Sequence, residues 1–149
     1  MEKPQPKALP SEEPLTDELL QELLGAPTPQ AFTEKLPQET RSLPQYLEYL
    51  LEKYSLSRVA VVRAAGLNET FGYQIFKGQR KASRNKILQL VFALHLSLQE
   101  ANRLLQAAGV NELYCKNRRD ALIIFCLNRH YTLQQVDEEL YRFKEETIC

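Results

Sequence analysis

Four polar side chains between residues 69 and 74 are of types that suit hydrogen bonding to a partner: Glu69, Thr70, Tyr73 and Gln74. Because residues one helical turn apart share a face, all four are expected to lie on one side of a helix. The Gln74 amide can pair with adenine in the major groove of DNA, and Glu69 would repel phosphate unless it accepted a hydrogen bond from cytosine. The predicted chemistry of this face is recognition of base edges, with Gln74 as the best single reader.

A cluster of basic residues accompanies this face. Residues 58–86 contain seven basic residues and one acid, a net charge of +6, although the whole chain has a formal charge of zero. Residues 1–57 (five basic, ten acidic) carry −5, and residues 87–149 (seven basic, eight acidic) carry −1. A confined cluster is typical of phosphate contact, and a solvated charged face is the alternative. The residues predicted to bind DNA phosphates are Arg58, Lys77, Arg80, Lys81 and Arg84.

Two short helices are predicted to position these residues. Ser57 is placed to cap the first, and Gly66 supplies a left-handed residue at its end. The apolar positions of this helix recur at helical spacing, at Val59, Val62 and Ala65. Asn68 can cap the second helix at once. Two helices joined so closely must cross steeply, which leaves the outer face of the second free to enter a groove.

The inner face of the second predicted helix is anchored by Leu67 and Ile75, and Lys77 with Gly78 ends the helix. Gly72 lies in its middle, where glycine costs about 1 kcal/mol relative to alanine. Two explanations of Gly72 stay open. Either it is only a poor helix residue, or it allows close packing against a neighbouring helix.

The segment from Leu56 to Leu98 resembles the helix-turn-helix of the lambda-repressor and Cro-type (Xre-like) DNA-binding family. The resemblance implies a five-helix core, with residues 68–75 lying in the major groove, and a role in transcription regulation. The order of elements along the chain is also similar to that of small accessory regulators of Gram-positive bacteria. The segment that carries the resemblance spans about a third of the chain, and the matching residues lie within it. They are Ser57–Arg58, Val61–Val62, Gly66–Leu67–Asn68, Ile75, Lys77–Gly78, Ile87–Leu88, Leu90–Val91, Leu94 and Ser97–Leu98.

Two residues of the proposed groove-binding helix depart from this family pattern. Gly72 stands where the family usually buries an aliphatic residue, and Glu69 stands where family members often carry a base-reading amide. These departures leave open a second interpretation, in which a repurposed helix-turn-helix scaffold acts as a helical adaptor that binds protein.

The whole sequence predicts an all-α, single-domain protein. Residues 1–15, with four prolines, are expected to be a disordered tail, and residues 16–41 an N-terminal helical arm. Residues 42–109 form the predicted helix-turn-helix domain, which opens on a capping box at Ser42. Residues 110–149 form a predicted C-terminal helical hairpin.

The N-terminal arm carries two further expectations. Residues 20–24 spell the LxxLL docking pattern, although an ordinary amphipathic helix is the more common explanation of such a sequence. The acids of residues 12–22 could fold back over the basic cluster and compete with phosphate. The alternative is that the arm packs on the core with its acids in water.

A weak internal repeat underlies the C-terminal half. Residues 85–109 and 119–143 each predict a helix, a capping box and a second helix, with the boxes beginning at Ser97 and Thr132. Two copies are too few for a solenoid, so a hairpin stacked on the core is expected. Two roles of this hairpin stay open, because it either forms a dimer interface or only completes the core.

Catalytic and metal-binding patterns are missing from the sequence. Cys115, Cys126 and Cys149 have no CxxC spacing, and Cys126 forms only an i, i+4 pair with His130, so no metal, cofactor or enzymatic activity is expected. Without a signal peptide or a long apolar run, the protein is expected to be cytoplasmic and to make no membrane contact. Double-stranded DNA is the expected partner, and a homodimer or a protein partner is left open.

Overall fold

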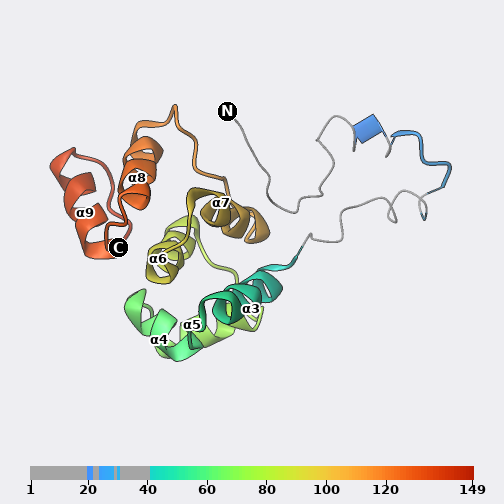
Figure 1. Cartoon of the computed structure of the whole chain (residues 1–149), viewed down its shortest axis with the longest axis horizontal. Helices are drawn as coiled ribbons and strands as arrows, with labels where there is room; N and C mark the ends of the chain where they lie inside the picture. Colours follow the sequence, from blue (N-terminus) through green and yellow to red (C-terminus); the bar gives the residue numbers. More distant parts are fainter. Residues whose placement is uncertain (1–19, 22–23, 29, 31–40) are drawn as a thin grey trace. The chain divides into compact units, whose positions relative to one another are not determined.

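The computed structural model describes residues 20–21, 24–28, 30 and 41–149. Within them the fold is all-α, as predicted, and no strand is present. The helices are α3 (Leu43–Tyr54), α4 (Arg58–Ala64), α5 (Glu69–Phe76), α6 (Arg84–Leu94), α7 (Leu98–Ala107), α8 (Arg118–Asn128) and α9 (Leu133–Arg142) (Figure 1). None of these helices is long and apolar enough to cross a lipid bilayer.

Residues 41–149 form one compact unit. In Figure 1, α8 and α9 lie at one end of this unit, α3, α4 and α5 at the other, and α6 and α7 between them. The predicted tail at 1–15 lies outside the described residues, and so does most of the predicted arm at 16–41. The proposed contact of the arm's acids with the basic cluster therefore also falls outside them.

Helix α3 begins as the sequence predicts. The Ser42 hydroxyl accepts a hydrogen bond from the Gln45 backbone N–H at 3.3 Å, and the Gln45 side chain accepts one from the Ser42 N–H at 3.0 Å. This reciprocal capping box satisfies two backbone donors that the first helical turn leaves unpaired. The buried face of α3 consists of Tyr46, Leu47, Leu50 and Leu51.

The predicted caps of the two short helices and the left-handed glycine between them are confirmed. Ser57 caps α4, Asn68 caps α5 by accepting from the Phe71 N–H, and Gly66 has a φ of 73°. The predicted inner face of α4 was wrong at Val59, which is 47% exposed. Val61, Val62 and Ala65 are buried, and Val59, six positions before Ala65, lies about 120° from it around the helix axis, which turns Val59 outward.

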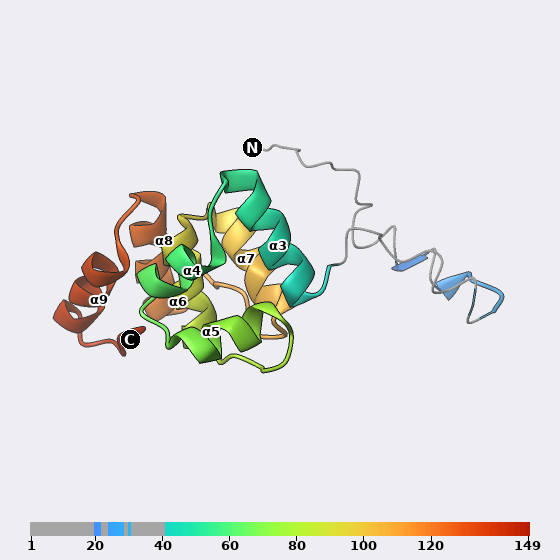
Figure 2. The ribbon, with the colours of Figure 1, turned by 90° about the horizontal axis from the view of Figure 1, so that it is seen from below.

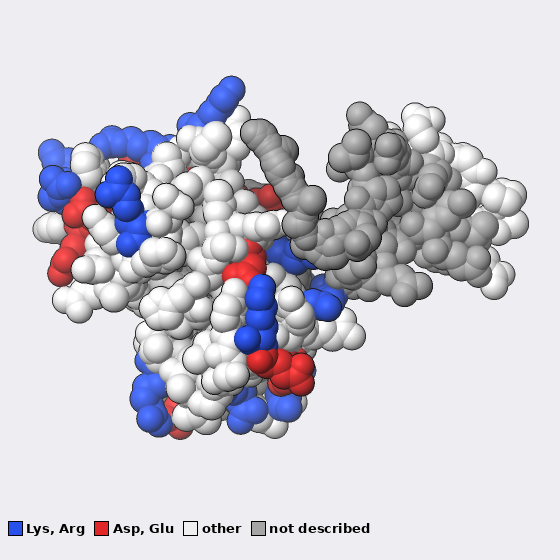
Figure 3. Space-filling view, in the orientation of Figure 1, with Lys and Arg blue, Asp and Glu red and all other residues white. Residues whose placement is uncertain are grey.

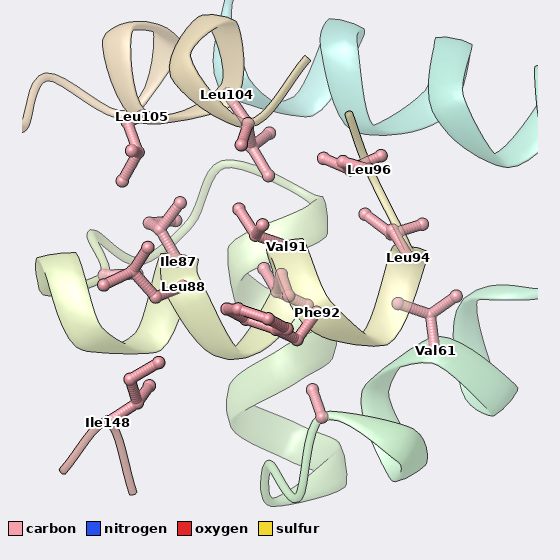
Figure 4. Close-up of a cluster of buried hydrophobic side chains, with 14 of the residues drawn as sticks. Val61, Ile87, Leu88, Val91, Phe92, Leu94, Leu96, Leu104, Leu105 and Ile148 are labelled. Atoms are coloured by element: carbon pink, nitrogen blue, oxygen red, sulfur yellow. The ribbon is translucent and has the colours of Figure 1, made fainter. Parts of the chain in front are cut away.

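The core is built around α6. Figure 4 shows its apolar side chains beneath those of α7, with Val61 from α4 and Ile148 from the C-terminal segment beside them. Every residue of α6 from Ile87 to Phe92 is buried, so this helix is covered on all sides. Figure 4 labels Val61, Ile87, Leu88, Val91, Phe92, Leu94, Leu96, Leu104, Leu105 and Ile148.

The two hairpins share the local features that the internal repeat predicts. Capping boxes at Ser97 and Thr132 begin α7 and α9. A histidine with positive φ follows the helix before each box, with 55° at His95 after α6 and 60° at His130 after α8. The α8–α9 hairpin contributes the core residues Ile123, Cys126, Leu127, Val136 and Leu140, so it completes the core.

Cys126 fills space in the apolar core. Its side chain lies in the core, and burial raises the pKa of its thiol to about 11. The thiol therefore stays protonated at neutral pH, and no cluster of three or more His, Cys, Asp or Glu residues that could hold a metal occurs within the described ranges.

Glu100, in the first turn of α7, connects this helix to the end of α3. Its carboxylate accepts hydrogen bonds from Lys53 Nζ at 2.7 Å and from the Tyr54 hydroxyl at 2.6 Å. Burial raises the pKa of Glu100, but these hydrogen bonds outweigh burial and hold its pKa below the ordinary 4.5. The charged form is therefore stabilised by folding.

We expect the Glu100 carboxyl to make the stability of the protein fall as the solution is acidified. A lowered folded-state pKa contributes stability that is present above about pH 4.5 and is lost as the pH falls through the folded-state pKa. Glu100→Gln should therefore be less stable than the native protein at neutral pH, and its stability should fall less steeply on acidification. Urea unfolding across the acidic range measures both effects, and equal slopes for the two proteins would contradict the assignment.

Candidate nucleic-acid interface

The four predicted base-reading residues lie together on α5. Glu69, Thr70 and Tyr73 are exposed and Gln74 is half-buried, whereas Gly72, Ile75 and Phe76 form the buried side of the helix. Helix α5 lies at the lower edge of the compact unit in both ribbon views (Figures 1 and 2). One polar face of a short helix is thus presented to the outside.

Gly72 brings α5 into close contact with α4. A Cβ atom built on Gly72 would lie 2.5 and 2.7 Å from the two Cγ atoms of Val62 and 3.1 Å from its Cβ. Because Val62 is β-branched and buried, its methyl groups cannot swing away from the added atom. Of the two explanations that the sequence leaves open, the structure therefore favours close packing.

Two of the predicted phosphate ligands meet at Tyr73. The Arg58 guanidinium carbon lies 4.8 Å from the centroid of the Tyr73 ring, and Lys77 Nζ lies 5.7 Å from it. Both distances lie in the range of cation–π attraction. The contact brings together charges from the start of α4 and the end of α5 that are far apart in the sequence.

Glu69 has a local partner, the guanidinium of Arg63. Their charged atoms are 3.3 Å apart, and both side chains are 71% exposed. An ion pair this exposed adds little stability, but Arg63 reduces the negative field of the only acid between residues 58 and 83.

Arg80 and Lys81 follow α5 in the loop that leads to α6. The Arg80 guanidinium lies 5.2 Å from the centre of the Phe71 ring and donates to Gln74 Oε1 at 3.4 Å. Lys81 is exposed. In the space-filling view, lysine and arginine side chains lie along the lower edge, where α4 and α5 are found in Figure 1 (Figure 3).

Arg84 does not belong to this surface, which corrects its predicted role in phosphate binding. Its Nη1 and Nη2 donate to the two carboxylate oxygens of Asp120 at 3.0 and 2.8 Å. Its Nε and Nη2 also donate to the backbone carbonyls of Asn111 and Glu112. The guanidinium is thus engaged within the fold. Between residues 58 and 83, five basic residues and one acid remain, a net charge of +4.

Gln89 is a positioning residue that the sequence analysis missed. It is 2% exposed, and its Nε2 donates to the Ala65 carbonyl at 2.8 Å, which ties the turn between α4 and α5 to the core helix α6. The available signal was a polar residue inside the apolar run from Ile87 to Phe92. Its partner, the Ala65 carbonyl, is 24 residues away in the sequence, so the local sequence pattern could not predict it.

The comparisons with known proteins identify no relative. No protein-family model, curated protein or solved structure matches the chain. What this surface does is therefore inferred from its own residues.

Proposed function

We propose that this protein binds double-stranded DNA sequence-specifically through the outer face of α5 and regulates transcription in the bacterial cytoplasm, without a cofactor and without catalysing a reaction. The observation that supports this best is the placement of charge around a polar helix face. Arg58 and Lys77 lie beside Tyr73, and Arg80 and Lys81 lie in the loop that follows α5. Such a face suits a groove that is lined by phosphates.

In this proposal α5 enters the major groove, which is wide enough for one helix. Thr70 and Gln74 contact base edges, while Arg58, Lys77 and Lys81 bind phosphates on the flanking strands. Close packing at Gly72 and the hydrogen bond from Gln89 hold α5 and the preceding turn in place. The resemblance of residues 56–98 to the lambda-repressor and Cro-type family agrees with this role.

The alternative from another class is a helical adaptor that binds a protein through the same face. One observation favours it: a shallow pocket of about 280 Å³ lies between α4 and α5, and the exposed Val59 contributes to its lining. An apolar contact of this kind would depend little on ionic strength.

The salt dependence of binding distinguishes these two functions. For Lys81→Ala we expect weaker binding to all duplexes alike and a log–log salt slope smaller by roughly one, because one phosphate contact is lost. Lys116→Ala removes the same charge from an exposed site before α8, so its slope should match that of the native protein. Fluorescence anisotropy with random-sequence duplex DNA measures both slopes. Equal slopes for Lys81→Ala and Lys116→Ala would remove Lys81 from the phosphate ligands.

A further inference from the structure

The chain folds back on α5 immediately after the helix ends. Gly78 adopts a φ of 75°, the Gly78 N–H donates to the Ile75 carbonyl at 3.1 Å, and the Gln79 N–H donates to the Gln74 carbonyl at 2.8 Å. This is the hydrogen-bond pattern of a Schellman turn, which reverses the chain direction at a left-handed residue. The turn brings Arg80 back alongside α5.

Two contacts then hold Arg80 against α5. Its guanidinium lies over the ring of Phe71, which is partly buried and packs on the core. Its Nη1 donates to Gln74 Oε1. Because a guanidinium has donors and no acceptors, the Gln74 amide must turn its oxygen toward Arg80. One lone pair of the oxygen is then engaged beside a positive charge, and the NH₂ group remains as the donor that the amide offers to another molecule.

The contact between Arg80 and Gln74 determines which base these two side chains can recognise. A glutamine that reads adenine must accept from N6 while it donates to N7. Because the Gln74 oxygen already accepts from Arg80, the N6 donor of adenine would have to approach it beside a guanidinium that also presents only donors. Guanine presents two acceptors, N7 and O6, and no donor on its major-groove edge. The donors of Arg80 and of the Gln74 amide match that edge.

We propose that Arg80 and Gln74 act as one donor unit that selects guanine in the major groove, an inference that rests on the proposed DNA binding. Arg80 then determines specificity and does not only bind phosphate, and Gln74 does not read adenine. Lys81, which is exposed and carries a compact charge without a planar fork, remains a phosphate ligand. Arg80 thus contacts a base, and its neighbour Lys81 contacts a phosphate.

Selection from random-sequence duplex DNA by the full chain tests this assignment. The native protein should enrich guanine at one position of the selected site, and Arg80→Lys and Gln74→Ala should both lose the preference at that same position. Arg80→Lys keeps the charge, so its affinity for random duplex DNA should stay near that of the native protein. Lys81→Ala is the matched control, because it should weaken all sequences and keep the preference.

A defined duplex then locates the contact on the base. Replacing the selected guanine by 7-deazaguanine removes the N7 acceptor and leaves base pairing intact. It should weaken the native protein about tenfold or more and have little effect on Arg80→Lys. Enrichment of adenine at the position that Gln74→Ala relaxes would overturn the inference, and so would an unchanged preference in Arg80→Lys. Binding without any sequence preference, or no binding, would instead contradict the proposed function itself.

Discussion

Asp120→Ala is expected to lower the free energy of unfolding by about 3 kcal/mol or more, because it leaves the partly buried guanidinium of Arg84 without its counter-charge. The Asp120 side chain is 7% exposed and that of Arg84 is 24% exposed. Asp120 Oδ2 also accepts from the Tyr114 N–H at 2.9 Å, so the substitution orphans a backbone donor as well. Chemical denaturation of the two proteins measures the difference.

Arg63→Ala provides the matched control, because it removes an ion pair whose two members are largely exposed. Its unfolding midpoint should stay close to that of the native protein. Arg84→Met should lower the free energy of unfolding much less in the Asp120→Ala protein than in the native protein. In the Asp120→Ala protein the Arg84 charge is already unpaired, so its removal breaks no ion pair. If Asp120→Ala and Arg63→Ala had equal unfolding midpoints, the Arg84–Asp120 ion pair between α6 and α8 would contribute nothing to stability.

Gly72→Ala is expected to destabilise the protein by up to about 2 kcal/mol, because overpacking a well-packed interior usually costs about 1–3 kcal/mol. The gain in helix propensity, about 1 kcal/mol, opposes this effect. Overpacking prevails because the added methyl would lie well inside van der Waals contact with both Cγ atoms of Val62. A thermal melt followed by circular dichroism measures the outcome.

Thr70→Ala controls for helix propensity, because it changes an exposed position of the same helix and should not destabilise the fold. Combining Gly72→Ala with Val62→Ala removes the two methyl groups that clash, so the double variant should be more stable than the sum of the single effects predicts. A more stable Gly72→Ala protein would show that α4 and α5 are not tightly packed at this point.

Signals that act between residues close in sequence were sufficient to predict much of the fold. The caps at Ser42, Ser57, Asn68, Ser97 and Thr132 all pair with a residue three positions later, so the sequence pattern displays both partners. The polar face of α5 was predictable for the same reason, since helical spacing groups its members.

Interactions between distant segments could not be predicted in this way. Arg84 belongs to the same run of basic residues as Lys81, and only the fold brings it to Asp120, 36 positions later. The approach of Gly72 to Val62 depends on how α4 and α5 cross, and the outward turn of Val59 depends on which side of α4 meets α6. In each case packing decided the role of a residue that local spacing had left ambiguous.

The central claim is that the face of α5 binds duplex DNA by sequence. The most direct test is selection of bound sequences from random duplex DNA by the full chain at low and moderate salt, with measured affinities for the selected and random duplexes. We expect one enriched site, tighter binding to it than to random DNA, and an affinity that falls steeply as salt increases. A palindromic site would indicate that two copies bind. No enrichment, together with binding that salt leaves unchanged or with no binding at all, would contradict the claim and favour the protein adaptor.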